Sequence, residues 1–302
     1  MSIPPPLTER VLQRLPGPRG LWVALWAAVS ILVYELAHRF ANLPTYPGAV
    51  YTMMSGYANL VGLIGARWLW RTLDEIRPAL KALMKEPASR LFEQAGWAAG
   101  PLLLSVLMSA TWTVTDFARY PGWVTAWIAA AQYFAYLPAN TGLWMYAVIV
   151  ADLYQLGRRP LHFHPFEEDR SLGVRPLGSL ASRAIFVLSA GLIPLAVAGV
   201  RDARTFIALL IVYVLGIAVM FLALWRIHLQ MLAEKTRVLG QARALVAEAI
   251  RPITASWTAE TLRTQAQVLG AADQVERRAA AIQEWPFDET ILTRIAAILT
   301  AV

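Results

Sequence analysis

Three residues near the middle of the apolar stretch 122–152 combine a backbone disruption with polar side chains. Pro138 lacks a backbone donor and displaces the carbonyl of Phe134, and Asn140 and Thr141 follow within one turn. An unpartnered carbonyl is costly in hydrocarbon, so neighbouring protein or water must cover it. The pattern predicts a broken helix that forms a pathway or binding site, or else a packed kink stabilised by Thr141 or Asn140.

A second group of polar residues recurs at four-residue steps in another apolar stretch. Ser105, Ser109 and Thr113 share one helix face, and Asp116 follows them. These hydroxyls either line a water-filled path or bond the carbonyls of their own helix and pack against a neighbour. Pro194, in a further apolar stretch, predicts another kinked helix and a second pathway candidate.

Glu35 and His38 are ionisable residues inside the first apolar stretch, three positions apart and therefore on one helix face. Charged groups inside spans usually face a bundle interior or a water-filled cavity, which favours a proton or cation role. The alternative is a cluster at the outer edge that reaches water or pairs with Arg119 or Arg201. The spacing also matches half of a di-iron site, but the sequence contains no second copy of the pair.

The segment 162–170 holds two of the four histidines, His162 and His164, beside three acidic residues. Residues two apart in an extended segment point the same way, so both imidazoles could bind one metal ion such as Zn²⁺. The alternative is an ordered loop packed on the ends of the spans. The sequence indicates no other cofactor, and the absence of cysteine excludes thiolate metal sites.

The residues from His164 to Gly178, with Gly173, Pro176 and Leu177 among them, resemble a cytoplasmic loop of uncharacterised bacterial multi-pass membrane proteins. That loop reads roughly His-Pro-Asp, a few residues, and then Gly-Leu-x-Pro-Leu-Gly. Phe166 stands where the family has Asp. The resemblance implies a bacterial membrane protein and implies no activity.

The composition indicates the class of protein that must position these residues. Hydrophobic residues make up 57% of the 302 residues and charged residues only 16%, compared with about 25% charged in soluble domains. The apolar residues also form long uninterrupted blocks, which predicts an all-α, polytopic membrane helix bundle in a lipid bilayer. The net charge of +7 then reflects basic loops beside anionic lipid, and nucleic acid is not an expected partner.

Hydropathy divides the chain into a lead (1–20), a transmembrane domain (21–226) and a helical tail (227–302). Six spans are expected, with approximate limits 21–41, 47–70, 96–115, 122–151, 184–200 and 205–225. An amphipathic helix outside the membrane is expected between the second and third spans.

The distribution of Lys and Arg predicts the topology. The lead, the loops 71–90 and 153–183, and the segment from Arg226 through the tail carry 22 of these residues, whereas the opposite side carries four. The positive-inside rule makes the basic side cytoplasmic. Both termini are therefore expected in the cytoplasm of a bacterium, with the protein integral to the cytoplasmic membrane.

The tail has a pattern of its own. Apolar doublets recur every seven residues, which predicts a coiled coil between chains or within one chain: Met231/Leu232, Val238/Leu239 and Leu245/Val246. A second helix is expected over 258–283. The sequence Trp-Pro-Phe-Asp at 285–288 then predicts a helix start, with Phe287 packing on Leu292.

The sequence contains no phosphate-binding glycine loop, no His-Glu-x-x-His motif and no nucleophile elbow, so it does not indicate a soluble enzyme. Three functions remain open. The kinked spans, the polar stripe and the associating tail favour a homo-oligomeric ion channel or pore. A secondary transporter with broken helices, carrying a small ion or small molecule, is the second hypothesis. A membrane scaffold, sensor or assembly factor, in which the polar residues only pack, is the third.

Overall fold

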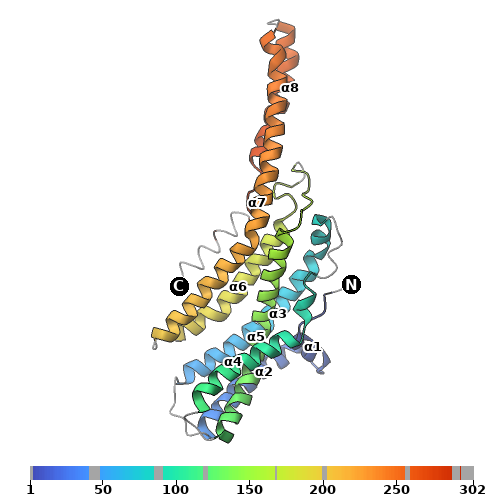
Figure 1. The fold of residues 1–302 in the computed structure, drawn as a ribbon. Helices are drawn as coiled ribbons and strands as arrows, with labels where there is room; N and C mark the ends of the chain where they lie inside the picture. The colour runs from blue at the N-terminus through green and yellow to red at the C-terminus, as the bar shows by residue number, and fades with distance from the viewer. Residues whose placement is uncertain are drawn as a thin grey trace.

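The computed structural model describes residues 3–40, 48–84, 91–117, 122–166, 169–198, 203–255, 259–287 and 293. This part of the chain is helical and contains no strand; one isolated antiparallel bridge joins Met84 and Leu161. The helices, shown in Figure 1, are α1 (Leu7–Arg14), α2 (Arg19–Phe40), α3 (Gly48–Leu83), the 3₁₀ helix η1 (Glu93–Gly96), α4 (Ala99–Phe117), α5 (Gly122–Gly157), α6 (Arg175–Ala198), α7 (Ala203–Ala255) and α8 (Ala259–Ala280). The predicted all-α fold is confirmed.

Two stretches of the described residues are long and apolar enough to cross a membrane, Thr125–Gly157 in α5 and Phe206–Glu248 in α7. A third candidate arises if α1 and the segment Arg19–Leu32, bent by 118°, count as one broken span. In α4 the described apolar segment, Ala99–Ala110, is shorter than a span. The structure therefore supports membrane association with two or three candidate spans, fewer than the six expected from the sequence.

The second predicted span is part of a longer helix. α3 does not end near Trp70 but continues to Leu83, so the expected separate amphipathic helix is an extension of this span. Leu73, Leu80 and Leu83 are buried along the extension. Their helical spacing keeps one apolar face against the bundle, which explains why the helix does not stop where the hydropathy falls.

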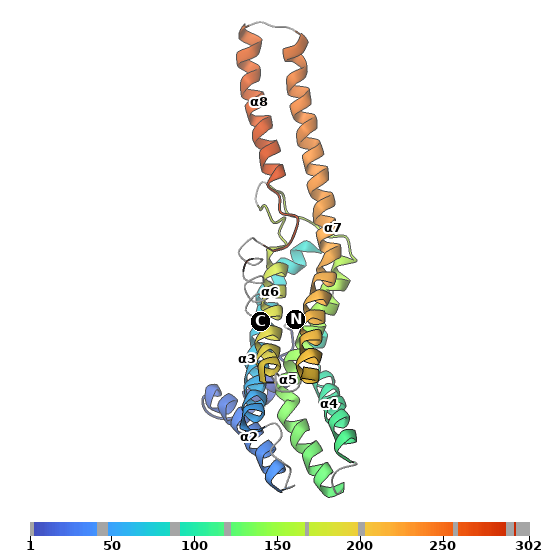
Figure 2. The same ribbon diagram turned by 90° about the vertical axis from the view of Figure 1, so that its left-hand side faces the viewer.

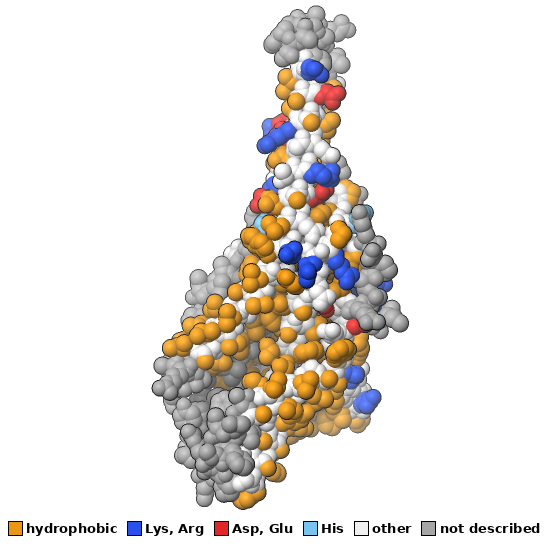
Figure 3. All heavy atoms as spheres, viewed as in Figure 1, with side chains coloured by type: hydrophobic (Ala, Val, Ile, Leu, Met, Phe, Trp, Pro, Cys, Tyr) orange, Lys and Arg blue, Asp and Glu red, His pale blue; other side chains and the backbone are white. Residues whose placement is uncertain are grey.

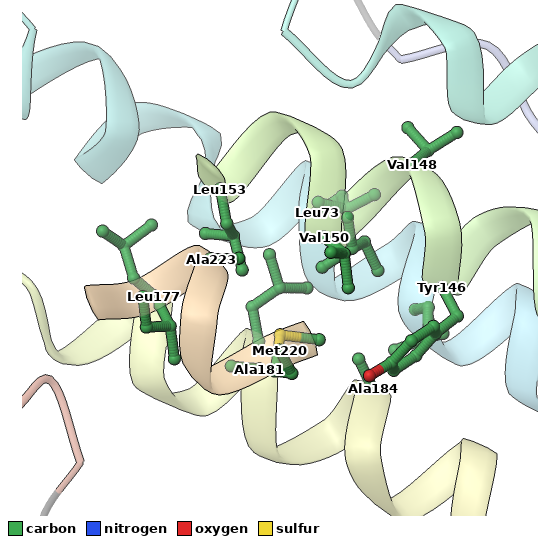
Figure 4. Packing of buried hydrophobic residues seen from close by; sticks show 14 of the residues in the cluster. Leu73, Tyr146, Val148, Val150, Leu153, Leu177, Ala181, Ala184, Met220 and Ala223 are labelled. Atoms are coloured by element: carbon green, nitrogen blue, oxygen red, sulfur yellow. The ribbon is translucent and has the colours of Figure 1, made fainter. Parts of the chain in front are cut away.

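The main core lies where α3, α5, α6 and α7 meet. Figure 4 shows Leu73, Leu153, Leu177 and Met220, one from each of these helices, pointing toward one another. All four are fully buried. The lead also joins this core, because Ile3 is buried and its carbonyl accepts a hydrogen bond of 2.9 Å from the indole of Trp70.

α7 continues beyond the core as one arm of a helical hairpin. Its 53 residues correspond to a length of about 80 Å. α8 runs back beside it, as Figure 2 shows. Ion pairs Lys235–Glu284 (3.0 Å) and Arg243–Glu276 (3.1 Å) fix an antiparallel register. The tail thus forms its helix–helix contact within one chain.

The surface separates into two parts. In Figure 3 hydrophobic side chains dominate the lower part of the visible face, whereas most charged side chains gather on the hairpin and around its base. Leu215 and Leu222 of α7 are 57% and 65% exposed. A belt of exposed apolar residues on long helices suits contact with lipid chains.

Candidate functional site

The predicted break in the fourth span is a proline inside a continuous helix. α5 runs from Gly122 to Gly157 with Pro138 within it. α3 crosses α5 at this point, where a methyl group on Gly62 would clash with the Pro138 carbonyl. Gly142 also faces Gly62. Glycine therefore lets the two backbones touch, and the proline lies in a close helix contact.

The polar residues beside Pro138 bond to neighbouring protein groups. The amide nitrogen of Asn140 donates to the hydroxyl of Ser105 at 3.0 Å, and both side chains are buried. Thr141 donates to the carbonyl of Leu137 at 2.8 Å, within its own helix. Ser109, one turn beyond Ser105, donates to the carbonyl of Ala129 at 2.8 Å. The bonds of Ser105 and Ser109 join α4 to α5, and all three bonds are of the kind that the packing alternative describes.

Two buried amides in the same bundle are not satisfied. Both polar atoms of Asn59, in α3, have no hydrogen-bond partner among the described residues, although the side chain is fully buried. The Oε1 of Gln132, in α5, is also unpartnered. Neither residue was among the candidates predicted from the sequence, although an amide inside an apolar span was the available signal.

The crossing of α3 and α5 gives a first testable prediction. Gly62→Ala is expected to destabilise the bundle by about 1–3 kcal/mol, because the added methyl overpacks the backbone contact. Gly191→Ala in α6 is the control, since among the described residues its new methyl would meet only Val61, at 3.9 Å. Thermal unfolding of the purified variants in detergent measures both. Equal stability of the two variants would contradict the close crossing.

Other candidates are placed only in part. Glu35 forms an ion pair of 3.3 Å with Arg39, one turn along α2. Arg119 and Arg201, the partners expected from the sequence, lie outside the described residues. The side chains of His38, Thr113, Asp116 and Pro194 lie outside the described residues, so these four stay predictions.

The histidine loop is an ordered segment between α5 and α6. His162 and His164 are exposed, and their amides donate to the carbonyls of Leu83 (2.7 Å) and Leu172 (3.1 Å). Gly173 has a φ of +83°, and a side chain there would clash with the His164 ring. Among the described residues no three His, Asp or Glu side chains gather closely enough to hold a metal ion. The loop geometry matches the packed alternative, and the metal pair stays a prediction.

Asp169 organises the second half of this loop. Its carboxylate accepts hydrogen bonds from the Ser171 hydroxyl (2.6 Å), the Ser171 amide (2.9 Å) and the Gly173 amide (2.9 Å). Burial raises the pKa of Asp169, but these hydrogen bonds and the nearby charge of His164 outweigh it and hold the pKa below its ordinary value.

The lowered pKa of Asp169 predicts how the loop responds to acid. Ionised Asp169 contributes stability that is complete above its ordinary pKa of 3.8 and is lost as pH falls below that value. Hydrogen exchange of the Ser171 and Gly173 amides, corrected for the intrinsic rates, should show full protection down to about pH 4. Loss of protection between pH 6 and pH 5 would contradict this assignment.

The loop also clamps the base of the hairpin. Leu172 is buried in a small cluster with Val238 and Ala242 of α7 and with Ala279 and Ile282 at the end of α8. The amide of Gln283 donates to the Arg170 carbonyl at 3.0 Å. The loop therefore contacts both arms of the hairpin.

A second clamp holds the end of α5 to α7. The amide nitrogen of Gln230 donates to the carbonyls of Gly157 (2.8 Å) and Arg159 (3.0 Å). Its oxygen accepts from the amide of Leu161 at 3.1 Å. The Gln230 side chain thus forms hydrogen bonds with backbone groups at and just beyond the C-terminal end of α5, where helix geometry leaves carbonyls without a partner.

The third contact is the strap, defined here as residues 284–287, which follows α8 back to the bundle. The Trp285 ring stacks on His228 at 4.2 Å, and Phe287 packs on Phe221 at 5.6 Å. The His228 Nδ1 lies 2.7 Å from the Glu284 carbonyl. A side chain at Gly178 of α6 would clash with the Pro286 carbonyl. The predicted contact of Phe287 with Leu292 lies outside the described residues.

Comparison with protein-family models, curated proteins and solved structures gives no match to this chain. The resemblance of the loop to bacterial multi-pass proteins therefore stays a prediction. Function must be inferred from the geometry alone.

Proposed function

We propose that this protein is a membrane-anchored scaffold whose α7–α8 hairpin presents a docking surface at a fixed position relative to the bilayer. One observation carries the proposal: three separate contacts tie the base of the hairpin to the bundle. They are the loop around Leu172, the amide of Gln230 and the strap. A flexible tail needs no such set of contacts, whereas a scaffold must hold its docking element in place.

The bundle supports a structural role for its polar residues. Asn140, Ser105, Ser109 and Thr141 bond to one another or to helix carbonyls. Gly62 brings α3 into backbone contact with α5 at Pro138. These residues were the main support for a pathway, and their hydrogen bonds and close contacts support a packing role.

The membrane arrangement is part of the proposal. We place α2 to α7 as six spans in the cytoplasmic membrane, with the hairpin and both termini in the cytoplasm. The apolar belt and the 22 basic residues on one side support this arrangement. Cysteine introduced at Arg243, on the hairpin, should react with an impermeant maleimide only after the cells are permeabilised.

The docking surface is the outer half of the hairpin. Leu245 is 53% exposed on α7 and Val268 is 53% exposed on α8. The heptad pattern itself needs no second copy, since α8 fills the seam within the chain. Homo-oligomerisation is a separate part of the proposal, and the protomer count of the purified protein tests it.

Site-specific photo-crosslinking in the native cell tests the scaffold function. A photoreactive residue at Leu245 or Val268 should give discrete protein adducts, whereas one at Leu222, on the apolar belt, should give none. Proteoliposomes containing the same protein should show no ion flux above that of empty vesicles. Flux together with an absence of adducts would contradict the proposal.

An ion channel is the second candidate, and the buried, unpartnered Asn59 favours it. A polar side chain without a partner inside the bundle is costly unless water or an ion reaches it. If flux is observed, Asn59→Leu should reduce it with the fold retained. If no flux is observed, the same substitution should stabilise the bundle, because it removes an unsatisfied amide.

A further inference from the structure

We propose that the arginines at the junction of α1, α2 and α3 bind the phosphate of an anionic phospholipid. Glu9 of α1 is buried and forms ion pairs with Arg19 and, at 3.8 Å, with Arg67. Arg71 lies one turn beyond Arg67, close enough for their charges to interact, and is exposed without an ion-pair partner among the described residues. Two guanidinium groups thus share a single carboxylate and a third lies near one of them, which leaves a surplus of positive charge.

The surface that leads from these arginines toward the proposed bilayer is apolar. Ile64 and Trp68 precede Arg71 by seven and three residues, on the same face of α3, and are 55% and 38% exposed. Leu21 and Leu25 of α2 are likewise exposed. A phospholipid fits this arrangement of a charged and an apolar surface, with its phosphate at the arginines and its acyl chains along the exposed apolar residues.

The geometry of α1 places the charged cluster at the level of the headgroups. α1 meets the start of α2 at 118°, so the chain leaves the direction of the span at this point. Guanidinium groups bind phosphate oxygens through paired hydrogen bonds. The choline of phosphatidylcholine carries a cation that neutralises this phosphate and is repelled by the arginines, whereas the glycerol of phosphatidylglycerol is neutral. Asp74, three residues beyond Arg71, pairs with none of the three arginines and does not occupy the site.

The test measures lipid binding by the purified full-length protein in detergent. Fluorescent phosphatidylglycerol is titrated against the protein, with phosphatidylcholine as the comparison lipid and inorganic phosphate as competitor. Phosphatidylglycerol should bind more tightly than phosphatidylcholine. Arg71→Gln should weaken it about fivefold, the effect of about one basic residue near a membrane surface. Arg159→Gln, at an exposed arginine beyond α5, should change nothing.

Each alternative outcome overturns the assignment. Equal affinity for the two lipids would show that the headgroup is not recognised. Equal losses of affinity in Arg71→Gln and Arg159→Gln would indicate non-specific electrostatic attraction. Full competition by inorganic phosphate indicates a site for the free anion. Arg71 is exposed, so its variant should keep the thermal midpoint of the wild type. The inference rests on the membrane placement of α2 and α3 and is independent of the scaffold role, which the crosslinking experiment tests separately.

Discussion

Replacement of Val238 by glutamate should unfold the hairpin while leaving the membrane bundle intact. Val238 is 6% exposed and packs with Ala242, Ala279 and Leu172, none of which can pair with a carboxylate. An uncompensated buried charge destabilises by about 3–5 kcal/mol. α8 should then lose its hydrogen-exchange protection.

Leu232→Glu is the matched control, since Leu232 is an apolar residue of the same helix but is 37% exposed. The sequence pattern places both Leu232 and Val238 in the heptad doublets, whereas the structure predicts different results for the two. If α8 loses hydrogen-exchange protection equally in both variants, Val238 does not lie in the buried contact between α7 and α8.

Trp285→Ala should detach the strap from the bundle. The Trp285 ring contacts His228 at 4.2 Å and Phe221 at 6.0 Å. Truncation of a fully buried tryptophan costs about 3–5 kcal/mol, and because Trp285 is half-buried we expect about 2–3 kcal/mol. Limited proteolysis near residue 283 should become faster, with α8 still folded on α7.

Trp97→Ala, at a tryptophan that is 54% exposed, serves as the control for this substitution. Its rate of cleavage near residue 283 should equal that of the wild type. If Trp285→Ala is also cut at the wild-type rate, the strap does not hold the hairpin to the bundle.

The helical class and the approximate positions of the helices could be predicted from the sequence. Hydropathy reports burial from water directly, so the apolar blocks identify α2 to α7. It does not report where a helix ends. α3 continues past Trp70 because Leu73 and Leu80 keep a buried face while the mean polarity rises.

The contacts that define the candidate site were less accessible to prediction. The heptad pattern indicates a partner helix but cannot say which one, and α8 of the same chain fills the seam. Gln230, Gly178 and His228 act through residues distant in sequence. A single sequence contains no signal for such long-range pairs. The Asn140–Ser105 bond depends on how α4 and α5 are aligned along their axes, which hydropathy does not resolve.

The most direct test of the account is a distance measurement between the hairpin and the bundle. The chain contains no cysteine, so spin labels can be attached at cysteines introduced at Gln155 of α5 and Arg278 of α8, both exposed. Pulsed electron resonance on the protein in lipid nanodiscs should give one narrow distance distribution. The same pair in the Trp285→Ala background should give a broader one. A broad distribution in the otherwise wild-type protein would contradict a fixed hairpin and, with it, the scaffold function.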